Sequence, residues 1–260
     1  MVVGMLKLNA MDKKYILLFF ILIFVIYTYQ NFDKLSQNLI GMNTIKSSNI
    51  YAILAIGDSL TEGLYSWPKS KKFHPYTTRL QTLLSKTFHH VEVTNAGISG
   101  NRVKDIRLRL RKQLKTKPYK LVLILAGTND YIYIVKKIKR NVADFKHFTH
   151  SVKQIANNIE ELHSICHKER IRTAVITIPP IQLEHQARIF TRYRSFINSL
   201  LKQYAESHRN VTVFIDLAAS IEKQSSGENE MKLWDDNVHF TPEGYDKMAD
   251  IIYDALKDYL

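Results

Sequence analysis

Cysteine is almost absent from this sequence of 260 residues. Its single copy, Cys166, cannot form a disulfide within the chain, so packing of the core must supply the stability. Acidic residues are also scarce, because 24 Asp and Glu stand against 37 Lys and Arg, for a formal net charge of +13. A charge of this sign fits nucleic acid, a solvated helix face or an anionic membrane surface.

Internal repeats and low-complexity tracts are not evident either. The length leaves room for one sizeable α/β domain but not for a second large one. The hydrophobic content of 45% is enough to bury a core. We therefore expect a single folded domain, over residues 51–260.

One long apolar run stands out near the amino end. Residues 15–32 carry no charge and follow Lys13 and Lys14. A bilayer span needs about 17–25 residues and a signal-peptide core only about 7–15, and no small-residue cleavage site follows this run. We expect an uncleaved signal anchor, with residues 1–14 in the cytosol, a tether over 33–50 and the domain on the lumenal or extracytoplasmic side. The alternative is secretion after signal cleavage.

From residue 51 onward, short apolar runs rich in β-branched residues alternate with stretches of helical period. Strands are expected at 51–56, 91–95, 121–126, 173–178 and 211–215, and helices near 76–87, 102–116, 150–168, 188–208 and 242–259. This alternation predicts a parallel sheet between two layers of helices. Parallel sheets bind ligands beyond the carboxyl ends of their strands, so the turns GDSL, AGISGN and GTND should share one functional edge.

The GDSL turn places Ser59 at that edge. A serine hydroxyl becomes a nucleophile only when a base removes its proton. Asp236 and His239 lie three residues apart in the loop DDNVH, a spacing that lets the carboxylate hold one imidazole nitrogen while the other faces the serine. The residues leave two alternatives open: the loop could merely cap the next helix, and Asp235 could be the partner of His239.

The other two turns offer hydrogen-bond donors for a negatively charged oxygen. Gly100 could present its backbone N–H, Asn129 its side-chain amide, and Ser59 its own backbone N–H. Each residue is also an ordinary turn former.

The blocks GDSLTEG, NAGISGN, GTND and DNVH resemble, in order and approximate spacing, the four signature blocks of the SGNH (GDSL-type) hydrolase family. The resemblance implies a three-layer α/β/α sandwich with a five-stranded parallel sheet, close to the flavodoxin-like topology. It implies Ser59 as nucleophile, His239 as base oriented by Asp236, and Gly100 and Asn129 as donors that complete the oxyanion hole. It implies no metal and no organic cofactor.

The activity implied is that of a serine esterase that hydrolyses a lipid acyl ester or an acetylated sugar through an acyl-enzyme. Two alternatives use the same residues: acyl transfer to a sugar or lipid acceptor, and a membrane-tethered binding module without catalysis. We expect residues 64–76 and 131–148 to be loops that form the substrate pocket, and their aromatic and basic content suits a lipid or a sugar ester.

Three further features have simpler interpretations. His163, Cys166 and His167 could bind zinc, but a solvated helix face is the simpler reading. The basic segment 102–120 reads as a helix with one buried and one solvated side, with contact to lipid headgroups or acidic glycans as the alternative. We expect no nucleic-acid partner. The triplet NVT at 210–212 would accept a glycan only in a eukaryotic host.

Overall fold

The computed structural model describes Leu18 and residues 24–32, 50–66, 69–140, 145–182, 184, 188–224 and 233–260. The chain divides into two compact units, Met1–Ile50 and Tyr51–Leu260. The expected anchor meets described residues only at Leu18 and 24–32, which are helical, and the expected cytosolic end and nearly all of the tether lie outside them. Within the described ranges, no helix is long and apolar enough to cross a membrane.

The second unit is built on a parallel sheet of five strands. These are β1 (Tyr51–Gly57), β4 (Val91–Gly97), β5 (Leu121–Leu125), β6 (Arg172–Ile176) and β7 (Thr212–Ile215). Their order in the sheet is β4-β1-β5-β6-β7, and every neighbouring pair is parallel. This is the flavodoxin-like order, in which the chain reverses direction across the sheet beside its first strand.

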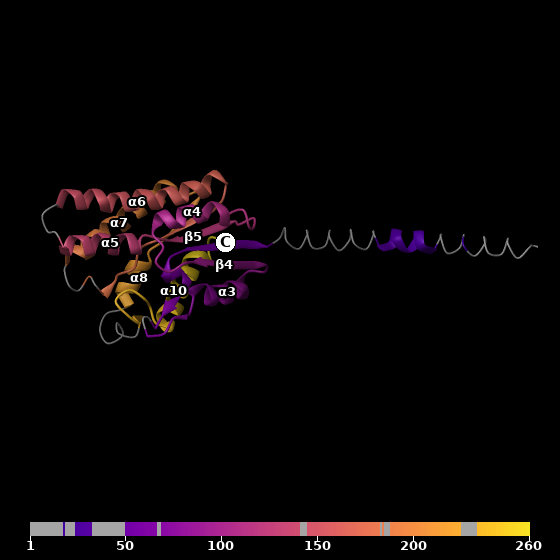
Figure 1. The fold of residues 1–260 in the computed structure, drawn as a ribbon, viewed down its shortest axis with the longest axis horizontal. Coiled ribbons are helices and arrows are strands. Elements are labelled where there is room, and N and C mark those ends of the chain that lie inside the picture. The colour runs from indigo at the N-terminus through magenta and orange to yellow at the C-terminus, as the bar shows by residue number, and fades with distance from the viewer. Residues whose placement is uncertain are drawn as a thin grey trace, which may run out of the picture. The chain divides into compact units, whose positions relative to one another are not determined.

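Helices cover both faces of the sheet (Figure 1). One face carries α4 (Val103–Gln113), α5 (Thr128–Arg140), α6 (Phe145–Lys168) and α7 (Arg188–Ser207), and the other carries α3 (Tyr76–Thr87), α8 (Leu217–Gln224) and α10 (Pro242–Leu256). The predicted three-layer α/β/α sandwich is therefore confirmed. A short helix, α2 (Ser59–Glu62), and a two-stranded hairpin, β2 (Leu64–Tyr65) with β3 (Lys72–Phe73), complete the elements between β1 and α3.

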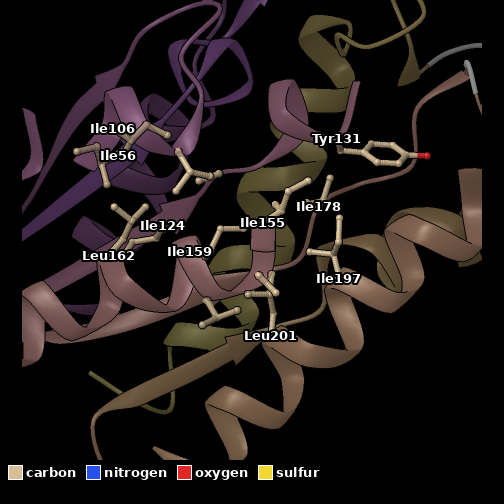
Figure 2. Packing of buried hydrophobic residues seen from close by; sticks show 14 of the residues in the cluster. Ile56, Ile106, Ile124, Tyr131, Ile155, Ile159, Leu162, Ile178, Ile197 and Leu201 are labelled. Carbon is tan, nitrogen blue, oxygen red and sulfur yellow. The ribbon is translucent and has the colours of Figure 1, made fainter. Parts of the chain in front are cut away.

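Alternation along the strands divides the core into two clusters. In β1, Leu54 and Ile56 face the cluster under α4 to α7, whereas Ile53 and Ala55 face the cluster under α3, α8 and α10. Figure 2 shows the first cluster, in which Ile155 and Ile159 of α6 pack against the sheet. Both clusters consist of residues from the second unit, so this unit has a complete core of its own.

The prediction of a pocket loop at 131–148 is wrong over most of that range. Residues 131–140 continue helix α5, and α6 begins at Phe145. The block from Tyr131 to Val135 is continuously apolar, and this hides its helical period. In the structure Tyr131, Ile134 and Val135 are buried at spacings of three and one, as one face of a helix requires.

The expectation that His163 and Cys166 lie on a solvated helix face is wrong, because both side chains of α6 are buried completely. Neither ring nitrogen of His163 has a hydrogen-bond partner. The ring lies beside Tyr204, with ring centroids 5.5 Å apart, and beside His167. Burial, followed by the charges of His167 and His208, lowers the pKa of His163 to about 3. Among the described residues there is no group of three His, Cys, Asp or Glu side chains that could hold a metal ion.

The buried imidazole makes stability depend on pH. Between about pH 6.5 and 3 the unfolded chain binds a proton at His163 that the folded chain does not, so the free energy of unfolding falls as the pH is lowered. His163→Leu is expected to remove this contribution, which amounts to about 2 kcal/mol between pH 7.5 and pH 5. Urea denaturation at both pH values measures it. The exposed His89 provides the control His89→Leu, and an unchanged pH dependence in His163→Leu would contradict the assignment.

Candidate active site

The turn after β1 presents Ser59 at the start of α2. Gly57 has no room for a side chain, because an added Cβ would lie 2.2 Å from Thr61 Oγ1 and 2.3 Å from the Leu125 carbonyl oxygen. Asp58 caps α2, with its Oδ1 accepting a hydrogen bond from the Leu60 N–H at 3.0 Å. Ser59 is the first residue of α2, so its backbone N–H has no acceptor within that helix.

His239 and Asp236 meet Ser59 across 180 residues of sequence. His239 Nε2 lies 2.9 Å from Ser59 Oγ, and His239 Nδ1 lies 2.7 Å from Asp236 Oδ2. An ionised carboxylate can only accept, so Nδ1 carries the proton and Nε2 is free to accept from the serine hydroxyl. The three groups form a continuous relay in which Ser59 is only 5% exposed.

Asp236 is held in its charged form. Its burial opposes ionisation, but hydrogen bonds from the His239 side chain and from the backbone N–H groups of His239 and Val238 outweigh it and lower the pKa of the carboxyl group. The two backbone bonds, at 2.6 and 2.7 Å to Oδ1, also fix the carboxylate in the loop before α10. That loop ends at Thr241, whose hydroxyl caps α10 by accepting from the Gly244 N–H.

Asp235, the alternative partner of His239, is used elsewhere. Its Oδ2 accepts a hydrogen bond from the Ser66 N–H at 2.6 Å. Ser66 has a positive φ of 61°, so this bond holds a strained turn of the β2–β3 hairpin against the loop that carries His239. The structure thus separates the two neighbouring aspartates into one that contacts the histidine and one that holds the hairpin.

Gly100 and Asn129 lie at the same edge of the sheet. Gly100 has φ +78° and an added Cβ would meet nothing within 4 Å, so the backbone conformation and not crowding requires glycine. Its loop is fixed to α2, because Glu62 Oε2 accepts from the Ser99 N–H at 2.8 Å. Asn129 Nδ2 donates to the Asn101 carbonyl at 3.0 Å and lies 3.4 Å from Asp58 Oδ2.

Asp58 therefore contacts both the nucleophile turn and the Asn129 amide. Its side chain is completely buried, and this burial raises its pKa to about 6, against the opposing effect of the Leu60 N–H and of His239. An amide nitrogen has two hydrogens, and Asn129 directs them to the Asn101 carbonyl and to Asp58 Oδ2, the contact to Asp58 being the longer of the two.

Arg109 is a site residue that the sequence reading missed. From the middle of α4 its guanidinium donates to the Gly57 carbonyl at 2.6 Å, to the Ala96 carbonyl at 2.5 Å and to Asn101 Oδ1 at 2.8 Å. One side chain thus joins the carboxyl ends of β1 and β4 to the loop after β4. Burial lowers the pKa of Arg109, yet a guanidinium with three acceptors stays charged.

Asp130 is a second residue that the sequence reading missed. Its carboxylate accepts from the Val103 N–H at 2.9 Å, so the GTND turn supports the first turn of α4. Burial raises the pKa of this carboxyl group. The GDSL, SGN and GTND turns are therefore fixed to one another by side chains outside the Ser59–His239–Asp236 relay.

A buried ion pair supports the loop behind Asp236. Arg194 of α7 is 2% exposed and donates to both carboxylate oxygens of Glu184, at 2.7 and 3.1 Å. Gln182 lies two residues before Glu184, and its N–H donates to the Asn237 carbonyl at 3.0 Å. This bond links the segment that carries Glu184 to the loop that carries Asp236.

Comparisons with known proteins bear on the family and the fold. The GDSL-like lipase/acylhydrolase family matches residues 55–247. Similar solved structures include a catalytic mutant of Axe2, an acetylxylan esterase from Geobacillus stearothermophilus, with a TM-score of 0.61, 20% identity and coverage of 79% of this chain and 94% of that chain. The lipase/acylhydrolase from Enterococcus faecalis has a TM-score of 0.60 and 22% identity, with coverage of 80% and 96%. No curated protein matches this chain in sequence.

At these identities the solved structures establish the fold alone. The family match is broader evidence, because it spans most of the chain and includes the GDSL turn at one end and the histidine loop at the other. The chain belongs to the GDSL-like lipase/acylhydrolase family.

Proposed function

We propose that the chain is a serine esterase that hydrolyses carboxylic esters through an acyl-enzyme. The observation that carries this proposal is the relay of 2.9 and 2.7 Å that joins Ser59, His239 and Asp236. Ser59 Oγ attacks the ester carbonyl while His239 Nε2 takes its proton, and Asp236 stabilises the imidazolium that forms. The alcohol leaves with the proton from His239. Water then attacks the acyl group by the same route and restores the serine.

The negative charge that develops on the carbonyl oxygen needs donors placed in advance. In this proposal they are the backbone N–H groups of Ser59 and Gly100 and the side-chain amide of Asn129. Loss of one such donor typically lowers kcat by about 100- to 1,000-fold. The fixed loop after β4 supports this role, because a donor that must first be ordered contributes less to the transition state.

The substrate we propose is a lipid acyl ester or an acetylated sugar. An acetylxylan esterase and a lipase/acylhydrolase are both among the structures of the same fold. The test is hydrolysis by the purified full chain of p-nitrophenyl esters of graded acyl length, beside acetylated xylo-oligosaccharides. Activity that rises with chain length would exclude the sugar ester, and a steep preference for acetyl groups would exclude the lipid. An absence of hydrolysis across the whole series, from a folded chain, would contradict the esterase proposal.

We also propose that residues 15–32 anchor the chain in a membrane, with the catalytic domain on the lumenal or extracytoplasmic side. The run is uncharged, and its described large apolar side chains are exposed, as in Phe24 at 67% and Phe32 at 70%. An exposed run of this kind favours apolar surroundings. When membranes that contain the full chain are extracted with alkaline carbonate and sedimented, the chain is expected to stay in the pellet. Release of a chain shortened at its amino end would support secretion instead.

A further inference from the structure

A concave feature lies away from the triad. It is a cavity of about 760 Å³ between the carboxyl ends of α4 and α6 and the starts of β5 and β6. The lining residues are Arg111, Leu114, Lys115, Lys117, Pro118, Tyr119, Lys120, Ile165, Lys168, Glu169, Arg170 and Ile171. Parallel strands start at the edge opposite to their ends, so the cavity and the triad lie at opposite edges of the sheet, roughly 20 Å apart along the strands.

The rim of this cavity is strongly cationic. Six of its lining residues are Lys or Arg, and the acidic member is Glu169 alone. Within the part of the chain that the structure describes, Lys117 is the one cation of the six that forms an ion pair, with Glu92. The floor, in contrast, is apolar and includes Leu114, Ile165 and Ile171. The cavity therefore fits an anion that carries an apolar portion.

Stabilisation of the helix dipole explains the position of only some of these cations. Arg111 and Lys168 lie in the last turns of α4 and α6, where a positive charge offsets the helix dipole. Lys115, Lys120 and Arg170 lie beyond the helix ends. Arg170 has a φ of +58°, in the left-handed region where glycine usually follows the end of a helix. The chain thus places an arginine at the rim in a conformation that glycine adopts more easily.

The cavity also lies at the edge where the chain enters the domain. The Lys120 N–H donates to the Ala52 carbonyl at 2.8 Å, so the start of β5 is directly beside the start of β1. Whatever precedes Tyr51 in the sequence joins the domain at this edge. The apolar run 15–32 is separated from Tyr51 by residues 33–50.

We propose that this cavity binds the phosphate headgroups of anionic phospholipids. The cationic rim would meet the phosphates and the apolar floor the first carbons below them. The interaction would hold the edge where the chain enters the domain against the membrane surface, and the edge that carries Ser59 would face away from it. The proposal does not depend on catalysis, so Ser59→Ala should bind vesicles as the unaltered chain does.

Sedimentation with vesicles tests the proposal on residues 51–260, which contain both core clusters. We expect binding to phosphatidylcholine vesicles that contain phosphatidylglycerol, little binding to pure phosphatidylcholine, and loss of binding as salt is raised. The triple variant Arg111→Gln, Lys115→Gln, Arg170→Gln is expected to partition about 100-fold more weakly, since each cation near an anionic surface contributes about fivefold.

The matched control removes the same charge elsewhere. Lys104, Lys153 and Arg192 are exposed cations outside the cavity, and their triple exchange to Gln should leave binding within about threefold of the unaltered domain. Equal loss in both triple variants, or equal binding to neutral vesicles, would overturn the proposal. So would preference for a DNA duplex over anionic vesicles at the same salt. Selective release by sodium phosphate at constant ionic strength would indicate a free phosphate ligand instead.

Discussion

Ser59→Ala is expected to lower kcat for ester hydrolysis by about 10⁴- to 10⁶-fold, and His239→Ala is expected to do nearly the same. The two effects should not add in the double variant, because the hydroxyl and the imidazole act as one unit at 2.9 Å. Steady-state hydrolysis of a short p-nitrophenyl ester measures all three variants. The residual rate should come from substrate binding and the oxyanion donors alone.

A folding control separates chemistry from stability in these variants. The side chain of Ser59 is small, so its loss leaves little space unfilled, and the midpoint of thermal unfolding should stay within a few degrees of the unaltered chain. Retention of more than a tenth of the activity in Ser59→Ala would remove the serine from the mechanism. A collapse of the fold in both variants would be resolved with Ser59→Gly and His239→Gln.

Arg109→Met is expected to give the second-largest loss, about 10- to 100-fold in kcat. The substitution keeps an unbranched apolar stem but removes the guanidinium donors that hold the Gly57 and Ala96 carbonyls. The turns after β1 and β4 would then no longer be fixed to each other. Because Arg109 acts on the position of the donors and not on the substrate, kcat should fall more than KM rises.

The same helix provides the control for this prediction. Arg107 lies two residues earlier and pairs with Glu161 on the exposed side of α4, so Arg107→Met should leave kcat unchanged. Arg109→Lys should recover part of the loss, since one ammonium group can reach one of the carbonyls. Equal kcat values in Arg107→Met and Arg109→Met would show that the contacts of Arg109 do not contribute to catalysis.

The order of the elements was predictable because parallel, doubly covered strands give continuous apolar runs. All five strands and α3, α4, α6, α7 and α10 lie close to the predicted ranges. Helix α5 was missed because its continuously apolar block Tyr131 to Val135 hides the helical period, and α8 because its eight residues, Leu217–Gln224, are too few to show a clear period. The family resemblance implied the flavodoxin-like strand order, whereas the β2–β3 hairpin depends on contacts that no single segment encodes.

The side chains that meet at Ser59 were predictable from the turns that carry them, whereas the residues that fix those turns were not. The basic segment RLRLRK, residues 107–112, reads as one solvated face of a helix, yet its three arginines have different surroundings. Arg107 pairs with Glu161, Arg111 lines the cationic cavity, and Arg109 holds the carboxyl ends of β1 and β4. A signal was present, because Arg109 lies three residues after the buried Ile106 and so shares its face of the helix.

The central claim is that Ser59 is the one serine of the chain that acts as an activated nucleophile. Covalent labelling of serine tests this claim most directly. A serine-reactive fluorophosphonate, added to the full chain and followed by mass mapping of peptides, is expected to give one adduct, on Ser59. Labelling should disappear in His239→Ala, which lacks the base. An adduct on another serine, or continued ester hydrolysis by a folded chain whose Ser59 stays unlabelled, would contradict the account.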